Sequence, residues 1–248
     1  MFYNEFTPSS DLCFGIAAYW VFDLSGVSGN HRFVVPPEGC LSLLVVEQSP
    51  GQVVHVELYA PRLGLHEVDI WGGMRYWGVR FYPGAFACFW DISCKAVVEA
   101  GNIPLSPDDF FQFSDQDTVN IQSIESWLRQ RVRRKPDEQV QKVVGYLMEQ
   151  PDGPRLDELL NVVHIGKRQL QRRFLKETGL TMKSYIRILR ARKALRQLLS
   201  QTKTLDIVHD LGYYDQAHLI HELGQLLGRT PTEIKADYQR IKQGNVIW

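Results

Sequence analysis

The sequence has little of what several large classes of protein require. Its four cysteines, Cys13, Cys40, Cys88 and Cys94, lack the spacing of metal ligands, and nothing in the chain suggests secretion. We therefore expect reduced thiols rather than a disulfide framework. The apolar segment 12–22 is too short to span a bilayer and lacks the preceding basic segment of a signal peptide. These absences favour a cytoplasmic protein with no membrane partner.

Motifs for catalysis are missing as well. There is no Gly-x-Ser-x-Gly, phosphate-binding loop or dinucleotide fingerprint. The amino-terminal histidines are scattered rather than arranged as His-x-His: His31, His55 and His66. Three later histidines invite a metal site but have no further convincing ligand nearby: His209, His218 and His221. We expect no catalytic residues, no metal and no cofactor, which disfavours an enzymatic function.

The net charge of zero conceals an uneven distribution. Residues 1–120 hold 5 Lys/Arg against 14 Asp/Glu, residues 121–136 hold 5 against 1, and residues 137–248 hold 18 against 13. Within the last part, residues 167–196 hold 11 basic residues and one acid, Glu177. An acidic part joined to a basic part predicts nucleic-acid binding by the second. A solvated helical surface is the alternative explanation.

The first 120 residues carry 20 of the 28 aromatic side chains. Segments such as 41–47 and 52–58 are rich in β-branched residues, alternate in part and are separated by Gly and Pro turn signals. This pattern predicts an antiparallel β-barrel or sandwich with an aromatic interior. A helix should follow over 120–135, with basic residues crowding its end and Pro136 stopping it. This helix would either dimerise or pack on its own barrel.

The rest of the chain predicts helices, in two similar arrangements. Helix 156–163, a break at 164–166 and helix 167–177 form the first helix-turn-helix unit. Leu170 and Phe174 share the packed face of its second helix. Helix 205–211, a turn at 212–214 and helix 215–227 repeat the arrangement. Two such units in tandem are far more specific to DNA binding than one.

Three further helices complete this part. Helix 137–150 has one apolar face, and helix 181–200 joins the two units. Thr230 and Glu233 form a capping box that opens a last helix to about Lys242. The expected fold class is α+β with two domains: 1–119 the β domain, 120–136 a linker helix and 137–242 the helical domain.

The helical part resembles the AraC/XylS family of transcription regulators. The resemblance covers about residues 139–240 and is carried by four segments: Leu170-Gln-Arg-Arg-Phe-Leu-Lys-Glu-Thr-Gly179, residues 185–190, Gly212-Tyr-Tyr-Asp-Gln-Ala-His218 and Gly228-Arg-Thr-Pro231. It implies a bacterial regulator, an activator among other modes, that binds double-stranded DNA through both units. RNA polymerase, a small-molecule effector and a second copy of the chain are further partners that the resemblance allows.

By position, the resemblance assigns base contacts in the first unit to Arg168, Gln171 and Arg172. Arg recognises guanine and Gln recognises adenine in the major groove. Three neighbouring cations are better placed as phosphate contacts or surface charges: Lys167, Arg173 and Lys176.

In the second unit the matching positions are Gln216, Ala217 and His221. Here the chain departs from the family, because His221 and Leu223-Gly224 stand where an Arg and an aromatic-Lys pair are usual. A histidine carries less positive charge at pH 7 than the usual Arg, so this unit should bind DNA more weakly. Asp215 is more simply a helix cap than a DNA contact. An alternative follows from this departure: an interaction protein whose module has lost sequence-specific DNA binding.

The family's usual amino-terminal partner is a cupin-like barrel that holds an effector. The segment 78–84 also resembles an uncharacterised domain that often precedes AraC-type DNA-binding domains. Aromatic residues with one cation could line a ligand-sensing pocket, in which Arg80 would meet an anionic group: Trp20, Tyr59, Trp71, Trp77, Arg80, Tyr82 and Phe86. The alternative is that these side chains belong to the core.

Overall fold

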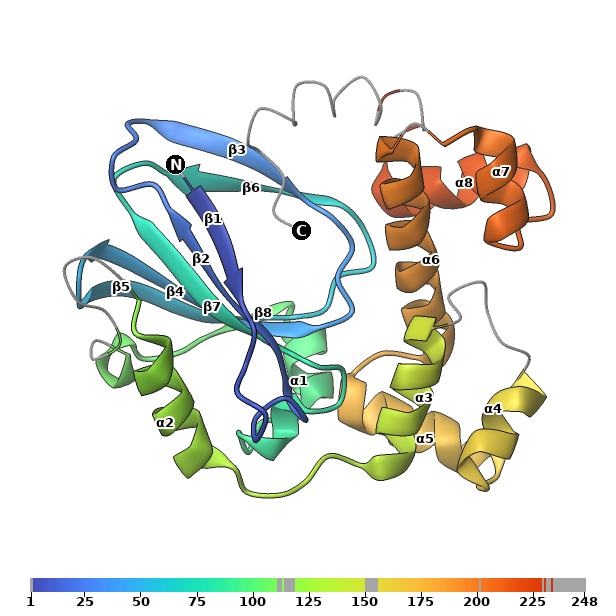
Figure 1. Cartoon of the computed structure of the whole chain (residues 1–248), viewed down its shortest axis with the longest axis horizontal. Helices are drawn as coiled ribbons and strands as arrows, with labels where there is room; N and C mark the ends of the chain where they lie inside the picture. Colours follow the sequence, from blue (N-terminus) through green and yellow to red (C-terminus); the bar gives the residue numbers. More distant parts are fainter. Residues whose placement is uncertain are drawn as a thin grey trace.

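The computed structural model describes residues 2–110, 113, 119–149, 156–200, 202–228, 230 and 233. It has a β-rich amino-terminal part and a helical carboxy-terminal part, which lie side by side (Figure 1). This arrangement confirms the predicted α+β class. Among the described residues, no helix is long and apolar enough to cross a membrane.

In the part of the chain that the structure describes, eight antiparallel strands form two sheets. Their bounds are β1 Phe2–Phe6, β2 Ile16–Asp23, β3 Asn30–Val35, β4 Leu41–Ser49, β5 Gln52–Tyr59, β6 His66–Trp71, β7 Arg75–Phe81 and β8 Asn102–Pro104. Six strands pair in the order β1-β2-β7-β4-β5-β8, and β3 pairs with β6 as a separate ribbon. Central strands alternate their apolar side chains between the two faces of the larger sheet, as the pleat requires.

Each face of the six-stranded sheet has its own cover. The short helices η1 (Phe86–Cys88), α1 (Cys94–Ala100) and η2 (Pro107–Asp109), with the longer α2 (Ile121–Arg131), lie on one face, over the larger core that contains Trp77 and Phe81 (Figure 1). The β3–β6 ribbon covers the other face, where Phe22 and Phe33 meet edge to face at 5.0 Å. The larger sheet is therefore covered on both faces. A cavity lies on the second face, between this sheet and the β3–β6 ribbon.

Helix α2 corrects one prediction about the linker. It packs Ile124, Trp127 and Leu128 on the β domain, but it ends at Arg131 rather than near residue 135. Val132 takes an extended conformation, and the backbone N–H of Arg133 then donates to the Cys88 carbonyl at 2.8 Å. Contacts with the β domain thus end the helix early, and the cations after Arg131 are not helix-terminal charges.

The helical part follows the predicted order, with bounds α3 Glu138–Glu149, α4 Leu156–Val163, α5 Lys167–Thr178, α6 Met182–Leu199, α7 Thr204–Asp210 and α8 Gln216–Leu227. Helices α4–α5 and α7–α8 are the two helix-turn-helix units. Helix α6 belongs to both cores: Tyr185 and Ile188 pack in the first, Ala194 and Leu198 in the second. Thr230 and Glu233 make the expected reciprocal hydrogen bonds, but the predicted helix to Lys242 lies outside the described residues.

Candidate functional site

The first unit separates a packed face from a polar face on α5. Leu170 and Phe174 are fully buried, with 0% of their surfaces exposed. The opposite side exposes the side chains of Lys167, Arg168, Gln171, Arg172 and Lys176. Because the packed face fixes the orientation of the helix, these five side chains point together into solvent. Such a helix can supply guanidinium and amide donors to base edges in a major groove.

Arg173 differs from its neighbours, because it is only partly exposed and already has a partner. Its Nη1 lies 3.4 Å from Asp137 Oδ2, at the start of α3. It therefore links two helices of the domain, and a phosphate contact would have to compete with Asp137.

Two separate features require glycine at position 179, directly after α5. Gly179 has a φ of +74°, in the left-handed region that L side chains rarely adopt. A Cβ there would also lie 2.7 Å from Val98 Cγ2 and 2.8 Å from the Cys94 carbonyl oxygen of α1. Gly179 thus ends the helix and also allows it to approach the β domain closely.

The second unit places its three candidate residues on an equally exposed face. Gln216, Ala217 and His221 of α8 are all exposed, and His221 Nε2 lies 2.8 Å from Gln225 Nε2. Asp215 caps the helix, since its carboxylate accepts from the His218 N–H at 2.7 Å, as predicted for this residue. Among the described residues, no group of three or more His, Cys, Asp or Glu side chains is arranged to hold a metal ion.

Two arginines of α6 tie the second unit to the first, and sequence reasoning did not single them out. Arg187 Nε lies 3.2 Å from Glu222 Oε1, and its Nη2 donates to Gln225 Oε1 at 3.3 Å. The Arg190 guanidinium lies over the Tyr213 ring, 4.2 Å from its centroid. A groove between α5 and α8 is lined by Lys167, Gln171, Arg187 and His221, among others. These contacts hold the two exposed helix faces at the edges of one groove.

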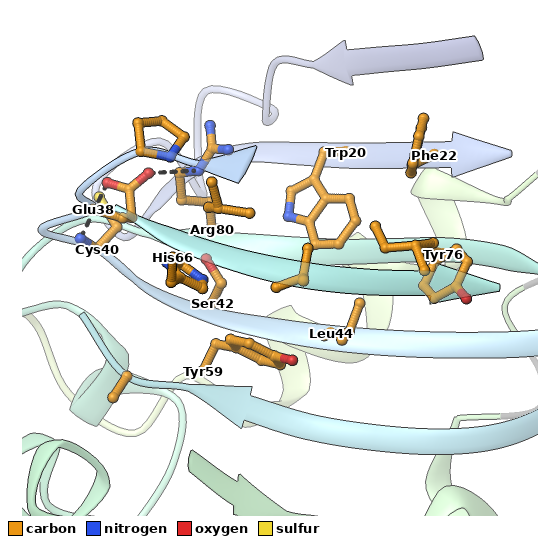
Figure 2. A pocket seen from close by; sticks show the side chains of 15 residues that line it. Trp20, Phe22, Glu38, Cys40, Ser42, Leu44, Tyr59, His66, Tyr76 and Arg80 are labelled. Carbon is orange, nitrogen blue, oxygen red and sulfur yellow. Dashed lines mark hydrogen bonds and ion pairs between the residues drawn. The ribbon is translucent and has the colours of Figure 1, made fainter. Parts of the chain in front are cut away.

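A second candidate site lies in the β domain, between the six-stranded sheet and the β3–β6 ribbon. It is a cavity of about 150 Å³ with apolar walls. Figure 2 shows Phe22, Leu44 and Tyr76 at one end and Glu38, Cys40, His66 and Arg80 at the other. The cavity therefore has an apolar end and a polar end.

The polar end holds both charged and neutral donors. Arg80 Nη1 lies 2.9 Å from Glu5 Oε1, and its Nε lies 3.5 Å from Glu38 Oε2. Burial and the nearby charge of Arg62 lower the pKa of His66 to about 4, so this ring is neutral at pH 7. Its buried Nδ1 has no hydrogen-bond partner among the described residues. A ligand with a polar group at this end could satisfy it.

The structure brings only some of the predicted pocket residues together. Trp20, Tyr59 and Arg80 line the cavity. Trp71 lies at the end of β6 with 61% of its surface exposed, because its Cα partner in the pairing is the terminal Asn30 of the ribbon. Tyr82 lines a cleft against α6 instead. The remaining two belong to the core on the opposite face of the sheet: Trp77 and Phe86. Successive side chains of a strand point to opposite faces of the sheet. Aromatic residues chosen only for their type therefore divide between the cavity and the core on the other face.

Two family models match the chain. One is described as "Helix-turn-helix domain" and matches residues 159–237. The other is described as "Domain of unknown function (DUF6597)" and matches residues 4–100. No curated protein matches the chain.

Solved structures of regulators are similar to parts of the chain or to most of it. The DNA-binding domain of AdpA, solved with a target DNA, is 19% identical over 44% of this chain and 99% of its own, with a TM-score of 0.40. An AraC-type regulator from Chromobacterium violaceum is 23% identical over 43% and 95%, with a TM-score of 0.39. ToxT from Vibrio cholerae is 7% identical over 84% and 97%, with a TM-score of 0.43.

Proposed function

We propose that this chain, which carries an AraC-type helix-turn-helix domain behind a domain of unknown function, is a transcription regulator that recognises a defined sequence in double-stranded DNA. The observation that carries the proposal is the two-sided character of α5. Its apolar side chains are fully buried, whereas its cations and Gln171 are exposed together.

The proposal gives the α5 side chains separate roles. Arg168, Gln171 and Arg172 contact base edges and set specificity, each bidentate contact contributing about 1–3 kcal/mol of discrimination. Lys167 and Lys176 contact phosphates and set affinity and its dependence on salt. Arg173 is shared with Asp137 and contributes least to DNA binding.

The second unit contributes fewer charges to DNA. Gln216 and His221 are exposed on α8, but Ala217 offers only a methyl group and the α6 cation Arg187 is paired with Glu222. We propose that this unit binds DNA more weakly than the first and extends the recognised sequence.

The cavity is the proposed effector site. Trp20 and Tyr59 supply apolar walls, and Arg80 meets an anionic group of a small molecule at the polar end. Its occupation would shift the chain between states that bind DNA differently.

Selection from a random duplex library tests the proposal, first with the whole chain and then with Arg172→Ala. We expect one enriched motif. Arg172→Ala should weaken binding to that motif roughly 5- to 150-fold, the equivalent of about 1–3 kcal/mol, and weaken binding to random DNA much less. Arg32→Ala, the same change on the β3–β6 ribbon, is the charge-matched control.

Two results would contradict the proposal. Equal losses on selected and random DNA would restrict Arg172 to phosphate contact. If the whole chain enriches no motif, the proposal is wrong and a module that binds another protein becomes the better explanation.

A further inference from the structure

The segment Pro36–Cys40 forms one wall of the cavity and also contacts the DNA-binding domain. Pro36, Glu38 and Cys40 line the cavity. On the other side of the same segment, the Pro37 carbonyl accepts from Arg192 Nη1 of α6 at 3.1 Å. Gly39 lies against the Tyr185 ring so closely that a Cβ there would be 2.5 Å from Cε2. A shift of this cavity wall must therefore be felt by α6.

Glu38 connects the two sides electrostatically. Its Oε2 lies 2.8 Å from Arg192 Nη1 and 3.5 Å from Arg80 Nε, and its Oε1 accepts the Cys40 N–H at 3.3 Å (Figure 2 shows the cavity side). Burial opposes its ionisation, but the charges of Arg192 and Arg80 outweigh burial and hold its pKa below the usual value. The carboxylate is thus shared between a cavity cation and a cation of α6, with the longer contact on the cavity side.

A second loop extends the connection to α8. Glu38 and Arg62 exchange backbone hydrogen bonds of 2.9 and 2.8 Å, which hold the two loops together. Beyond Arg62, the Leu65 N–H donates to the Leu226 carbonyl near the end of α8 at 2.9 Å. A Cβ on Gly64 would lie 2.7 Å from that same carbonyl oxygen. At the polar end of the cavity, one loop therefore contacts α6 and the other contacts α8 of the second unit.

We propose that a small organic anion with an apolar body binds in the cavity, and that Glu38 transmits its binding to α6 through Arg192. The carboxylate of the ligand pairs with the Nε side of the Arg80 guanidinium and displaces Glu38 from it. Glu38 retains its ion pair with Arg192. The 36–40 segment then moves with its carboxylate, and α6 moves with the segment. This inference rests on the proposed function, in which the cavity is the effector site.

The shared carboxylate makes opposite predictions for its two neighbours. Glu38→Gln removes the carboxylate that pairs with Arg80 on its Nε side and leaves Glu5 on Nη1, so an acid should bind more tightly. Arg192→Met leaves Glu38 with Arg80 alone as its arginine partner, so the competition grows and the acid should bind more weakly. Arg192 does not line the cavity among the described residues, so this effect has to pass through the 36–40 segment, which Arg192 contacts at Glu38 and at the Pro37 carbonyl. Opposite shifts at two residues of one ion pair would not arise from a general loosening of the interface.

The first experiment is calorimetric titration of the full chain with 3-phenylpropanoate and, as its uncharged counterpart, 3-phenylpropanamide. We expect the acid to bind more tightly than the amide. Its Kd should fall at least fivefold in Glu38→Gln and rise at least fivefold in Arg192→Met, as for a modest coupling between sites. The Kd of the amide should follow neither change.

Two further variants sharpen the test. Lys193 lines the same cleft against α6 as Arg192 and Tyr82. Lys193→Met removes this neighbouring charge but leaves the Glu38–Arg192 pair intact, so the Kd of the acid should stay within twofold of the wild-type value. Arg192→Lys keeps the charge with a shorter reach, and it replaces Arg192→Met if that variant does not fold. The proposal is overturned if both ion-pair variants shift the Kd in one direction, if acid and amide bind equally, or if the acid fails to bind even Glu38→Gln.

The second experiment measures transmission to DNA. Saturating acid should change the affinity of the wild-type chain for its selected duplex several-fold, and the change should shrink in Arg192→Met. No change in the wild type would overturn the transmission. The two proposals fail separately, because the absence of a selected DNA motif refutes the proposed function while the acid titrations are interpreted without DNA.

Discussion

Gly78 lies in the middle of β7, beside the cavity-lining residue Trp20 of β2. A Cβ on this residue would lie 2.3 Å from the Leu43 carbonyl oxygen and 2.5 Å from Trp20 Cζ2. The carbonyl belongs to the neighbouring strand β4 and cannot retreat without disturbing the β4–β7 pairing. The indole is half-buried against the cavity. Gly78→Ala therefore inserts a methyl group where neither neighbour can yield easily.

The magnitude follows from overpacking in a well-packed core. Inserting one carbon atom into such a core costs about 1–3 kcal/mol, and we expect the upper half of this range because one of the two clashes is with backbone. A smaller effect offsets it, since Ala in place of Gly restricts the unfolded chain and contributes roughly 0.4–1 kcal/mol. The net expected loss in the free energy of unfolding is about 1–2.6 kcal/mol.

Gly145 supplies a control with the same chemical change. It lies inside α3, it is exposed, and a Cβ on it would meet nothing within 4 Å. Gly145→Ala should therefore stabilise the chain by about 0.5–1 kcal/mol, the cost of glycine in a helix interior. In urea unfolding monitored by tryptophan fluorescence, the midpoint concentration of urea should fall for Gly78→Ala and rise for Gly145→Ala. If Gly78→Ala is as stable as the wild type, the reasoning from steric contact at this strand is refuted.

Two other predictions concern charged or titratable groups. The Glu177 carboxylate is only 7% exposed and lies 2.5 Å from Arg134 Nη2. Arg134→Met removes this charge partner, so the free energy of unfolding should fall by about 1–3 kcal/mol. An unchanged urea midpoint would contradict this prediction. His66, with its pKa lowered to about 4, is neutral when folded but protonated when unfolded below about pH 6.5, so stability should fall as the pH drops from 6.5 towards 4. His66→Gln should reduce this slope in thermal unfolding across that range, and an equal slope would show that His66 does not contribute.

The helical part could be predicted from sequence because its signals are local. Gly179 and Gly228 end the second helix of each unit, both with positive φ, and Leu170 with Phe174 marks the packed face. The Asp215 cap needed only the side-chain chemistry of one residue. Helices whose boundaries depend on neighbours along the chain are the most accessible to such reasoning.

The cavity could be predicted only in part because it is assembled from distant strands. Trp20, Tyr59 and Arg80 were expected there, but nothing in the sequence relates Glu38 to Arg192. The early end of α2 has the same origin, since it depends on the hydrogen bond from Arg133 to Cys88. These features depend on strand pairing, on register and on contacts between domains. The periodicity of residues within one segment does not predict them.

Helix α6, Met182–Leu199, joins the two hydrophobic cores of the helical part as one continuous helix. Because one uninterrupted helix runs through both cores, the separation of α5 and α8 is set by the protein rather than by the DNA. One extra base pair between two recognised segments would displace the second by about 3.4 Å and rotate it by roughly a tenth of a turn. A site recognised by both units should therefore tolerate base changes in its second segment more readily than any insertion between the segments.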